Sequence, residues 1–312
     1  MNPVFSLLVL PFLCCLILTG IHAYLGLHVV ERGVIFVDLS LAQVAALGTT
    51  IAFLAGHDLH SQASYFYSLG FTLIGALLFS ITRFEKKRIP QEAFIGIVYA
   101  VCAAASILIV DRAPEGAEHI KYILVGNLLA VTPHEVIKMA ALYSCVGVIH
   151  WIWRKPILAV SLSSQKAEES GRPSIGEEVP LQCRDKVSGL SSISEEVPLQ
   201  CRDKVSGLSV RFWDFVFYGT FGFVVTSSVA IAGVLLVFSF LIVPSVIAML
   251  FSEKVGVRLL IGWVLGTVVS LLGMVASYKF DTPTGATVVV LFGVSLIAAL
   301  LAQKILRTNS KV

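Results

Sequence analysis

Long apolar stretches recur along the chain, with short polar connections between them. About twenty apolar residues are needed for a helix to cross the hydrocarbon core of a bilayer. The candidate spans lie at 4–26, 34–56, 65–83, 93–110, 134–153, 212–230, 233–251, 257–277 and 285–303. The sixth and seventh are nearly continuous, so one tilted or broken element, and therefore eight full crossings, is the alternative. The pattern predicts an all-α, polytopic integral membrane protein with 8 to 9 transmembrane helices, in which residues 1–312 form one domain.

The stretch 230–255 combines a long apolar run with three interruptions. Gly233 lies near its start, Pro244 lies inside it, and a polar Ser-Glu-Lys sequence follows at 252–254. A proline removes a backbone donor and clashes with the preceding turn, and in lipid the freed carbonyl needs a partner from a neighbouring helix. We therefore expect the helix to break at Pro244 and to form a joint there.

The composition agrees with a membrane protein. Hydrophobic residues make up 56% of the chain and charged residues 14%, and the mean hydropathy is +0.87, which leaves too little polar surface for a soluble globule. The six cysteines form no CxxC pair, and Cys14, Cys15, Cys102 and Cys145 lie in apolar runs, so no disulfide framework is expected. The N-terminal stretch lacks a basic region and a cleavage site, and we expect it to be retained as the first span.

Basic residues are distributed unevenly among the connections. Loops 27–33, 83–92, 154–211 and 252–258 and the tail 303–312 can all be placed on one side of the membrane. That side then holds all of the 23 Lys and Arg except Arg112, Lys121, Lys138 and Lys279. Because basic connections face the cytoplasm, the C-terminus is predicted to lie inside and, with nine spans, the N-terminus outside.

Two local signals lie between the fourth and fifth spans. Residues 119–129, HIKYILVGNLL, are apolar but too few to cross, which predicts a re-entrant or interfacial segment on the outer side. The fifth span then opens with Thr132, Pro133, His134 and Glu135, the pattern of a capping box with proline at the first helical position.

The longest connection contains a tandem repeat. Residues 170–187, SGRPSIGEEVPLQCRDKV, recur as 188–205, SGLSSISEEVPLQCRDKV, and include Cys183 and Cys201. Each unit mixes both signs of charge with a proline and shows no sustained apolar period, so we predict that 170–205 is a disordered insertion in a cytoplasmic loop.

Several kinds of catalytic motif are absent from the sequence. It has no GxxxxGK[ST] phosphate loop, so no ATP site of this type is expected in the chain, and neither HExxH nor GxSxG occurs. Polar residues inside spans are the remaining candidates, since they are costly in lipid. Asp38 and Gln43 are candidates to line a pathway, although five residues along a helix place them about 140° apart. Asp38 alternatively lies near the cytoplasmic end, close to water or Arg32.

The connection after the second span carries a possible metal-binding group. His57, Asp58 and His60 offer two imidazoles and a carboxylate, which suit a metal such as zinc, although short loops also carry such residues for solvation. His22 and His28, near the end of the first span, are expected to pack between helices.

Four stretches in this order carry a resemblance: 36–48 (FVDLSLAQVAALG), 122–133 (YILVGNLLAVTP), 233–248 (GVLLVFSFLIVPSVIA) and 280–290 (FDTPTGATVVV). With them the chain resembles the permease of metal-type ABC importers for zinc, manganese or iron. The resemblance implies a homodimeric or paired permease, a separate cytoplasmic ATP-binding subunit that holds the ATP, and an extracytoplasmic metal-binding protein. It implies a cytoplasmic coupling segment at Pro244, Ser245, Met249, Glu253 and Lys254.

The chain departs from the family pattern at three positions. Where the family commonly has Asp and, four residues on, His in the second span, this chain has Leu39 and Gln43, with Asp38 displaced by one residue. Asn127 replaces an Asp in the short outer segment, and it is a further pathway candidate. These changes lower the charge available to a dication.

The sequence therefore predicts an ABC importer permease of the inner membrane that moves a divalent metal ion. The chain itself is expected to bind no cofactor, to hydrolyse no ATP, to contact lipid, and to have no nucleic-acid partner. The alternative is an ion-coupled secondary transporter, which would need no nucleotide-binding partner. A membrane enzyme would need a catalytic constellation that the sequence does not display.

Overall fold

A computed structural model describes residues 3–58, 61–82, 90–111, 126, 128–157, 160–161 and 207–309. The elements are α1 (Pro3–Glu31), α2 (Val37–Leu54), α3 (Gln62–Ile81), α4 (Gln91–Val110), η1 (Leu128–Ala130), α6 (Pro133–Ile152), α10 (Gly207–Ala232), α11 (Val234–Phe251), α12 (Val255–Phe280) and α13 (Thr284–Asn309). Within the described ranges, nine helices are long and apolar enough to cross a membrane. The all-α polytopic prediction is confirmed, and the sixth and seventh spans are two separate helices.

A single glycine separates these two helices. Gly233 lies between α10 and α11 with φ of 78°, a left-handed conformation that side chains disfavour. Gly126, with φ of 67°, packs against this junction, and a Cβ on it would lie 2.4 Å from the carbonyl carbon of Ala232. The junction is therefore a tight contact between backbones.

The expected break at Pro244 is wrong, because α11 runs without interruption from Val234 to Phe251. Pro244 is buried, and the Oγ of the next residue, Ser245, donates a hydrogen bond to the carbonyl of Leu241 (2.8 Å). Neighbouring helices hold α11 in place: a Cβ on Gly26 of α1 would lie 2.0 Å from the Leu241 carbonyl oxygen. Close packing on both sides keeps the helix continuous despite the missing donor.

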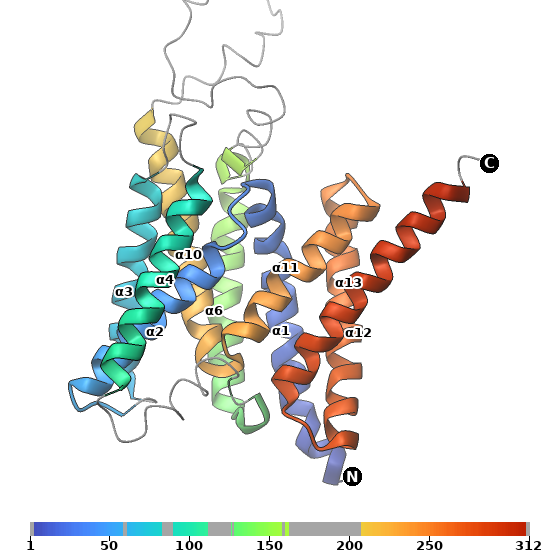
Figure 1. The fold of residues 1–312 in the computed structure, drawn as a ribbon, viewed down its shortest axis with the longest axis horizontal. Helices are drawn as coiled ribbons and strands as arrows, with labels where there is room; N and C mark the ends of the chain where they lie inside the picture. The colour runs from blue at the N-terminus through green and yellow to red at the C-terminus, as the bar shows by residue number, and fades with distance from the viewer. Residues whose placement is uncertain are drawn as a thin grey trace, which may run out of the picture.

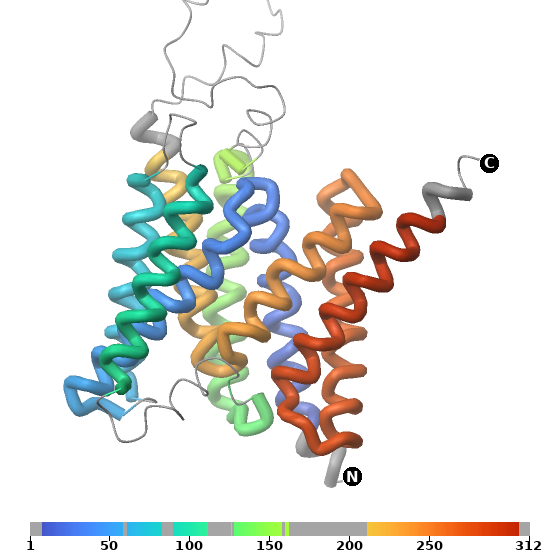
Figure 2. Tube along the Cα trace, in the orientation of Figure 1, coloured from blue at the N-terminus to red at the C-terminus, as the bar shows by residue number. Residues whose placement is uncertain are grey.

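The helices form two groups that lie side by side in Figures 1 and 2. One, here the α2 group, contains α2, α3, α4 and α10, and the other, the α1 group, contains α1, α11, α12 and α13. Helix α6 stands between them and contacts α1 and α10. Contacts within each group are more extensive than contacts between the groups.

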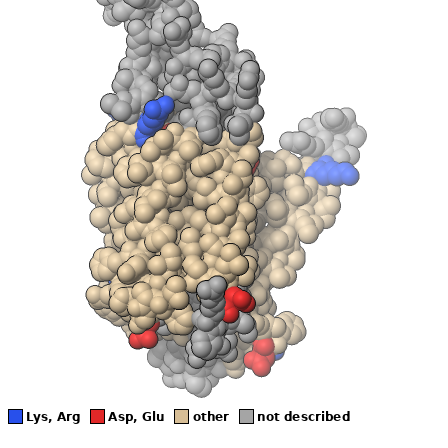
Figure 3. Space-filling model, turned by 60° about the vertical axis from the view of Figure 1, so that its left-hand side comes forward, with Lys and Arg blue, Asp and Glu red and all other residues tan. Residues whose placement is uncertain are grey.

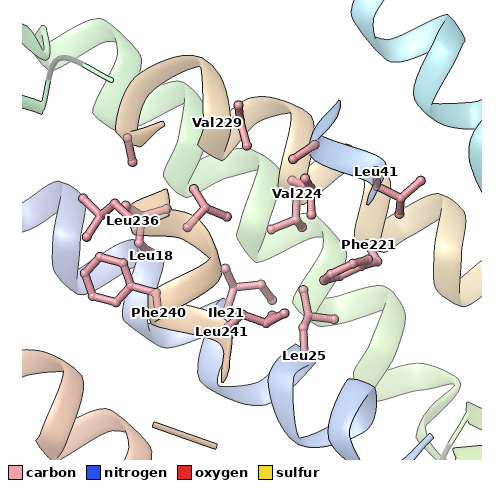
Figure 4. Packing of buried hydrophobic residues seen from close by; sticks show 14 of the residues in the cluster. Leu18, Ile21, Leu25, Leu41, Phe221, Val224, Val229, Leu236, Phe240 and Leu241 are labelled. Carbon is pink, nitrogen blue, oxygen red and sulfur yellow. The ribbon is translucent and has the colours of Figure 1, made fainter. Parts of the chain in front are cut away.

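A shared apolar core fills the space where the groups meet. Figure 4 shows Leu18, Ile21 and Leu25 of α1 close to Leu241 and Phe240 of α11, with side chains of α10 alongside. These α1 and α11 residues are at most 8% exposed. Burial of a side chain of this size stabilises by about 1.5–3 kcal/mol, so this core is the main apolar link between the groups.

Charged residues gather at the two ends of the molecule. The face in Figure 3 is uncharged across its middle, as expected for a surface that contacts lipid. We call the end where α2, α10 and α12 finish the outer end, following the predicted orientation, and the opposite end the inner end (Figure 1). The repeat 170–205 and most of the segment 119–129 lie outside the described residues.

Candidate functional site

A cavity of about 490 Å³ opens at the outer end between α2, α3, α6 and α10. Its lining combines small, hydroxyl-bearing and apolar side chains with one cation and one carboxylate. The lining residues are Ala45, Ala46, Thr49, Ser61, Gln62, Ser64, Tyr65, Phe66, Ser68, Glu135, Lys138, Met139, Leu142, Thr226, Ser227, Val229, Ala230 and Ile231. The sequence analysis did not predict this cavity, since its residues come from four separate spans.

The two charged groups of the cavity are held differently. Glu135 belongs to the predicted capping box, which is confirmed: its Oε2 accepts hydrogen bonds from the backbone N and the Oγ1 of Thr132, both at 2.8 Å. The Nζ of Lys138 lies 5.2 Å from the centre of the Tyr65 ring, and the Tyr65 hydroxyl is 3.0 Å from the Oγ of Ser227. Three helices thus position the ammonium group at the cavity.

Asp38 and Gln43 are both buried in α2 rather than exposed to water. Asp38 is 1% exposed, and its Oδ1 has no hydrogen-bond partner among the described residues. The suggested neighbour Arg32 instead forms an ion pair with Asp214. Gln43 is 8% exposed, two residues before the cavity-lining Ala45. An unpartnered buried carboxylate oxygen is costly, which keeps Asp38 a candidate for the pathway.

The predicted metal ligands are not brought together in the described part of the chain. His57 and Asp58 are exposed in the connection after α2, and the His57 ring lies 6.0 Å from the Tyr67 ring, centre to centre. His60 and Asn127 lie outside the described residues. Among the described residues, no group of three or more His, Cys, Asp or Glu is arranged to hold a metal ion.

Buried polar contacts connect α1, α6 and α10 midway between the ends. The Nε2 of His22 lies 3.3 Å from the Oγ of Ser228, which also contacts the hydroxyl of Tyr143. His22, as expected, packs between helices and is fully buried. These contacts link the α1 group to α6 and the α2 group through three side chains.

A second polar cluster joins the end of α1 to Ser161, which follows α6, and to α10 at the inner end. The Nη1 of Arg32 donates to Oδ1 of Asp214 at 2.6 Å, and both side chains are at most 3% exposed. The Nε of Arg32 donates to the Oγ of Ser161 (2.9 Å), which lies 3.0 Å from Nδ1 of His28. The Arg32 guanidinium also stacks 3.9 Å from the centre of the Phe217 ring. The one signal for this cluster in the sequence was the presence of charged residues, Arg32 and Asp214, near the ends of predicted spans.

The predicted coupling residues lie in two environments. Pro244 and Ser245 are buried, and Met249 is half-buried within α11. Glu253 and Lys254 are exposed in the short turn between α11 and α12 at the inner end. This arrangement separates a rigid helical part from an accessible turn.

Residues that the sequence analysis did not single out hold this turn. The Nε of Arg258 donates to the Ser252 carbonyl (2.7 Å), and its Nη1 pairs with Glu31 at the end of α1. The Nε2 of Gln303 in α13 donates to the Leu250 carbonyl (2.9 Å). The turn is thereby fastened to three helices of the α1 group.

With this geometry in place, the chain can be compared with known proteins. A model of the ABC 3 transport family matches residues 5–175 and 200–303, which is most of the chain. The chain belongs to the ABC 3 transport family. The resemblance inferred from the four sequence stretches is thus confirmed, and the internal gap in the match, 176–199, falls within the tandem repeat.

Relatives of this ABC 3 family chain match it over most of their length. It is 25% identical over 300 residues to a "Probable iron transport system membrane protein" of Haemophilus influenzae, covering 94% of this chain and 92% of that protein. It is 22% identical over 281 residues to the "Manganese transport system membrane protein MntC" of Listeria innocua, covering 90% of this chain and 85% of that one. The fold is similar to PsaBC of Streptococcus pneumoniae, with a TM-score of 0.67, 18% identity, and coverage of 95% of this chain and 91% of that chain.

Proposed function

We propose that this chain is the membrane-spanning permease subunit of an ABC importer that moves zinc, manganese or iron into the cytoplasm. The observation that carries the proposal is the family match across both groups of helices, from residue 5 to residue 303. Relatives named for iron and manganese transport support a metal cargo. ATP is hydrolysed on a separate cytoplasmic ATP-binding subunit, and this chain binds no cofactor of its own.

The proposed assembly contains further partners. An extracytoplasmic metal-binding protein delivers the ion at the outer end, and a second permease copy completes a homodimer in the inner membrane. The C-terminus then lies in the cytoplasm, as the distribution of Lys and Arg predicts. Asp38, Gln43 and Asn127 are the proposed pathway residues, and the outer connection with His57, Asp58 and His60 remains a weaker candidate for a first metal contact.

In the proposed mechanism, the ATP-binding subunit contacts this chain at the α11–α12 turn. Glu253 and Lys254 are exposed there and offer the ATP-binding subunit a surface. Arg258 connects the turn to Glu31, so a displacement of the turn also displaces the end of α1. From there the buried ion pair of Arg32 with Asp214 leads into the α2 group. Such a continuous set of contacts is what a two-state transporter needs to couple its ends.

Uptake into sealed vesicles tests the proposal. We expect zinc, manganese or iron to accumulate only when the ATP-binding subunit is co-expressed and ATP is supplied on its side. Accumulation without ATP would instead identify an ion-coupled secondary transporter.

Asp38→Ala tests the pathway assignment in the same vesicles. Removing a buried carboxylate from the pathway should lower uptake about tenfold or more without lowering the amount of inserted protein. Leu54→Ala, at an exposed position of the same helix, is the matched control. Unchanged uptake by Asp38→Ala would remove this residue from the pathway.

A further inference from the structure

Three of the four tryptophans of the chain lie at the inner end, where two spans reach the surface of the bilayer. The span of α6 ends at Ile152, between Trp151 and Trp153. The span of α10 begins at Arg211, two residues before Trp213. Tryptophan concentrates at the depth of the lipid headgroups, because its ring is apolar and its indole N–H is polar. The two span ends therefore present aromatic side chains at headgroup depth.

These aromatic side chains touch across the two helices and are open at the surface. The rings of Trp153 and Trp213 lie 5.8 Å apart, centre to centre, and the Phe212 ring lies 5.5 Å from that of Trp213. Trp151, Trp153 and Phe212 are 69%, 43% and 57% exposed. We call Trp151, Trp153, Phe212 and Trp213 the aromatic patch. Edge-to-face packing orders these rings, so the patch is a formed surface that lipid can reach.

Two basic residues follow the aromatic patch directly. Arg154 and Lys155 are exposed just after the end of α6, and neither forms an ion pair with a described residue. The carboxylate next to Trp213, Asp214, is buried and already pairs with Arg32, so it offers these two cations no partner. On the face in Figure 3, Lys or Arg atoms (blue) stand out at the inner end. The aromatic patch therefore has unpaired positive charge beside it.

Rings at headgroup depth with cations beside them suit a phospholipid of net negative charge. The Arg154 guanidinium can bind two phosphate oxygens at once, and Lys155 adds a second positive charge. A zwitterionic headgroup carries an ammonium group that the same two cations repel. The turn that we assign to the ATP-binding subunit lies elsewhere, between α11 and α12 of the α1 group. The position at two span ends thus favours lipid over a protein partner.

We propose that the aromatic patch, together with Arg154 and Lys155, is a binding site for an anionic phospholipid. The lipid phosphate binds Arg154 and Lys155, and the glycerol and upper acyl chains pack on Trp153 and Trp213. The bound lipid bridges the ends of α6 and α10. This site is independent of the cargo and of ATP.

Tryptophan fluorescence of the purified full-length permease in lipid nanodiscs tests the inference. Trp263→Phe removes the one tryptophan outside the patch, and lipids with brominated acyl chains quench the indole rings that they contact. Brominated phosphatidylglycerol in plain phosphatidylcholine is compared with the reverse labelling. We expect phosphatidylglycerol to bind at the patch at least about fivefold more tightly, a difference that corresponds to about 1 kcal/mol. The preference should fall as the salt concentration rises.

Matched variants separate a local site from a general attraction to charge. Arg154→Gln combined with Lys155→Gln should lower the preference to less than about twofold. Lys279→Gln combined with Lys304→Gln removes the same charge at exposed positions of α12 and α13 and should leave the preference unchanged.

A second set of proteins makes Trp263 of α12 the reporter. Replacing Trp151, Trp153 and Trp213 together by Phe leaves Trp263 as the remaining tryptophan, and the two brominated lipids should quench it equally. An equal preference for phosphatidylglycerol at Trp263 would show a general effect and would overturn the local site.

Two further results would contradict the inference: equal quenching of the patch by both lipids, or an unchanged preference in the Arg154 and Lys155 double variant. If the ATP-binding subunit shielded the patch from brominated phosphatidylcholine, the patch would be a protein contact and the lipid site would be wrong. Vesicle uptake decides the transport function separately, because the lipid preference is measured without metal or ATP. Either proposal can therefore fail while the other stands.

Discussion

The α1 group and the α2 group are both closely packed at glycines, as where a Cβ on Gly48 of α2 would lie 2.8 Å from the Cα of Ser68 in α3, but they differ in the cavity that the α2 group contains at its outer end. In the α1 group, α1, α11 and α12 cross at glycines: a Cβ on Gly26 would lie 2.0 Å from the Leu241 carbonyl oxygen, and one on Gly266 2.5 Å from Thr19. In the α2 group, α2, α3 and α10, together with α6, leave an open cavity at the outer end. Close packing is thus common to both groups, and the second group also has space into which a ligand fits.

Polar contacts join the groups in addition to the shared apolar core. The Arg32 to Asp214 pair and the His22 to Ser228 contact both run from α1 to α10. Buried ion pairs contribute directional, breakable connections rather than large net stabilisation. These few side chains are therefore specific polar connections between the two groups.

Breaking the ion pair between Arg32 and Asp214, which joins the two groups, should have the largest effect on stability. Asp214→Ala leaves the Arg32 guanidinium buried at 3% exposure without its carboxylate, which should cost about 3–5 kcal/mol of stability. Thermal unfolding of the purified protein in detergent measures the loss as a lowered Tm.

A double variant serves as the control for this experiment. Arg32→Met combined with Asp214→Leu removes both charges and keeps apolar volume, so most of the stability should return. If Asp214→Ala unfolded at the same temperature as the unchanged protein, the ion pair would not join the groups.

Forcing apart α1 and α11 within the α1 group should have the next largest effect on stability. Gly26→Ala introduces a Cβ against the backbone of α11, so the two helices must separate at a cost of about 1–3 kcal/mol. Gly20→Ala, six residues earlier on α1, meets nothing within 4 Å and should leave the Tm unchanged or slightly raised. Equal melting temperatures for the two variants would mean that the crossing is not tight.

The fold was largely predictable because lipid imposes a simple length rule on apolar helices. The nine spans follow from the sequence within a few residues of their ends, and the capping box at Thr132 was recognised from four residues. The break at Pro244 was predicted wrongly because proline chemistry is local. What keeps α11 continuous is its packing against α1 and α12, which a one-dimensional pattern does not contain.

The candidate site was less predictable, since its parts come together only in three dimensions. Asp38 was recognised as a charge within an apolar span, but its burial and its unpartnered oxygen were not. The cavity draws on four helices, and the partners Arg32 and Asp214 are 182 residues apart. Their pairing depends on how α1 packs against α10, which no local spacing reveals.

Loosening the α11–α12 turn should have a smaller effect that appears in coupling rather than stability. Glu31→Gln and Arg258→Gln each remove the charge pair that fastens the turn to α1, whose side chains are 10% and 13% exposed. The ratio of metal imported to ATP hydrolysed in vesicles should fall about tenfold while ATP hydrolysis continues.

Exchanging the two charges tests whether the pair itself matters. Glu31→Arg combined with Arg258→Glu should recover part of the lost coupling, although the bond from Arg258 to the Ser252 carbonyl is not restored. A normal import ratio in both single variants would show that motion of the turn reaches the α2 group by another route.

Deleting residues 170–205 should have the smallest effect on uptake. The repeat lies in the sequence between α6 and α10 and shows no apolar period that would pack against either group. Each halving of loop length changes the free energy of closure by only about 0.6 kcal/mol, so the shorter connection should be tolerated. Uptake by the deletion variant, normalised to inserted protein, should equal that of the full chain, and removal of one unit, 170–187, should behave identically. Uptake lost only when both units are absent, in a protein that inserts normally, would assign the repeat a role in joining the ATP-binding subunit to the inner end.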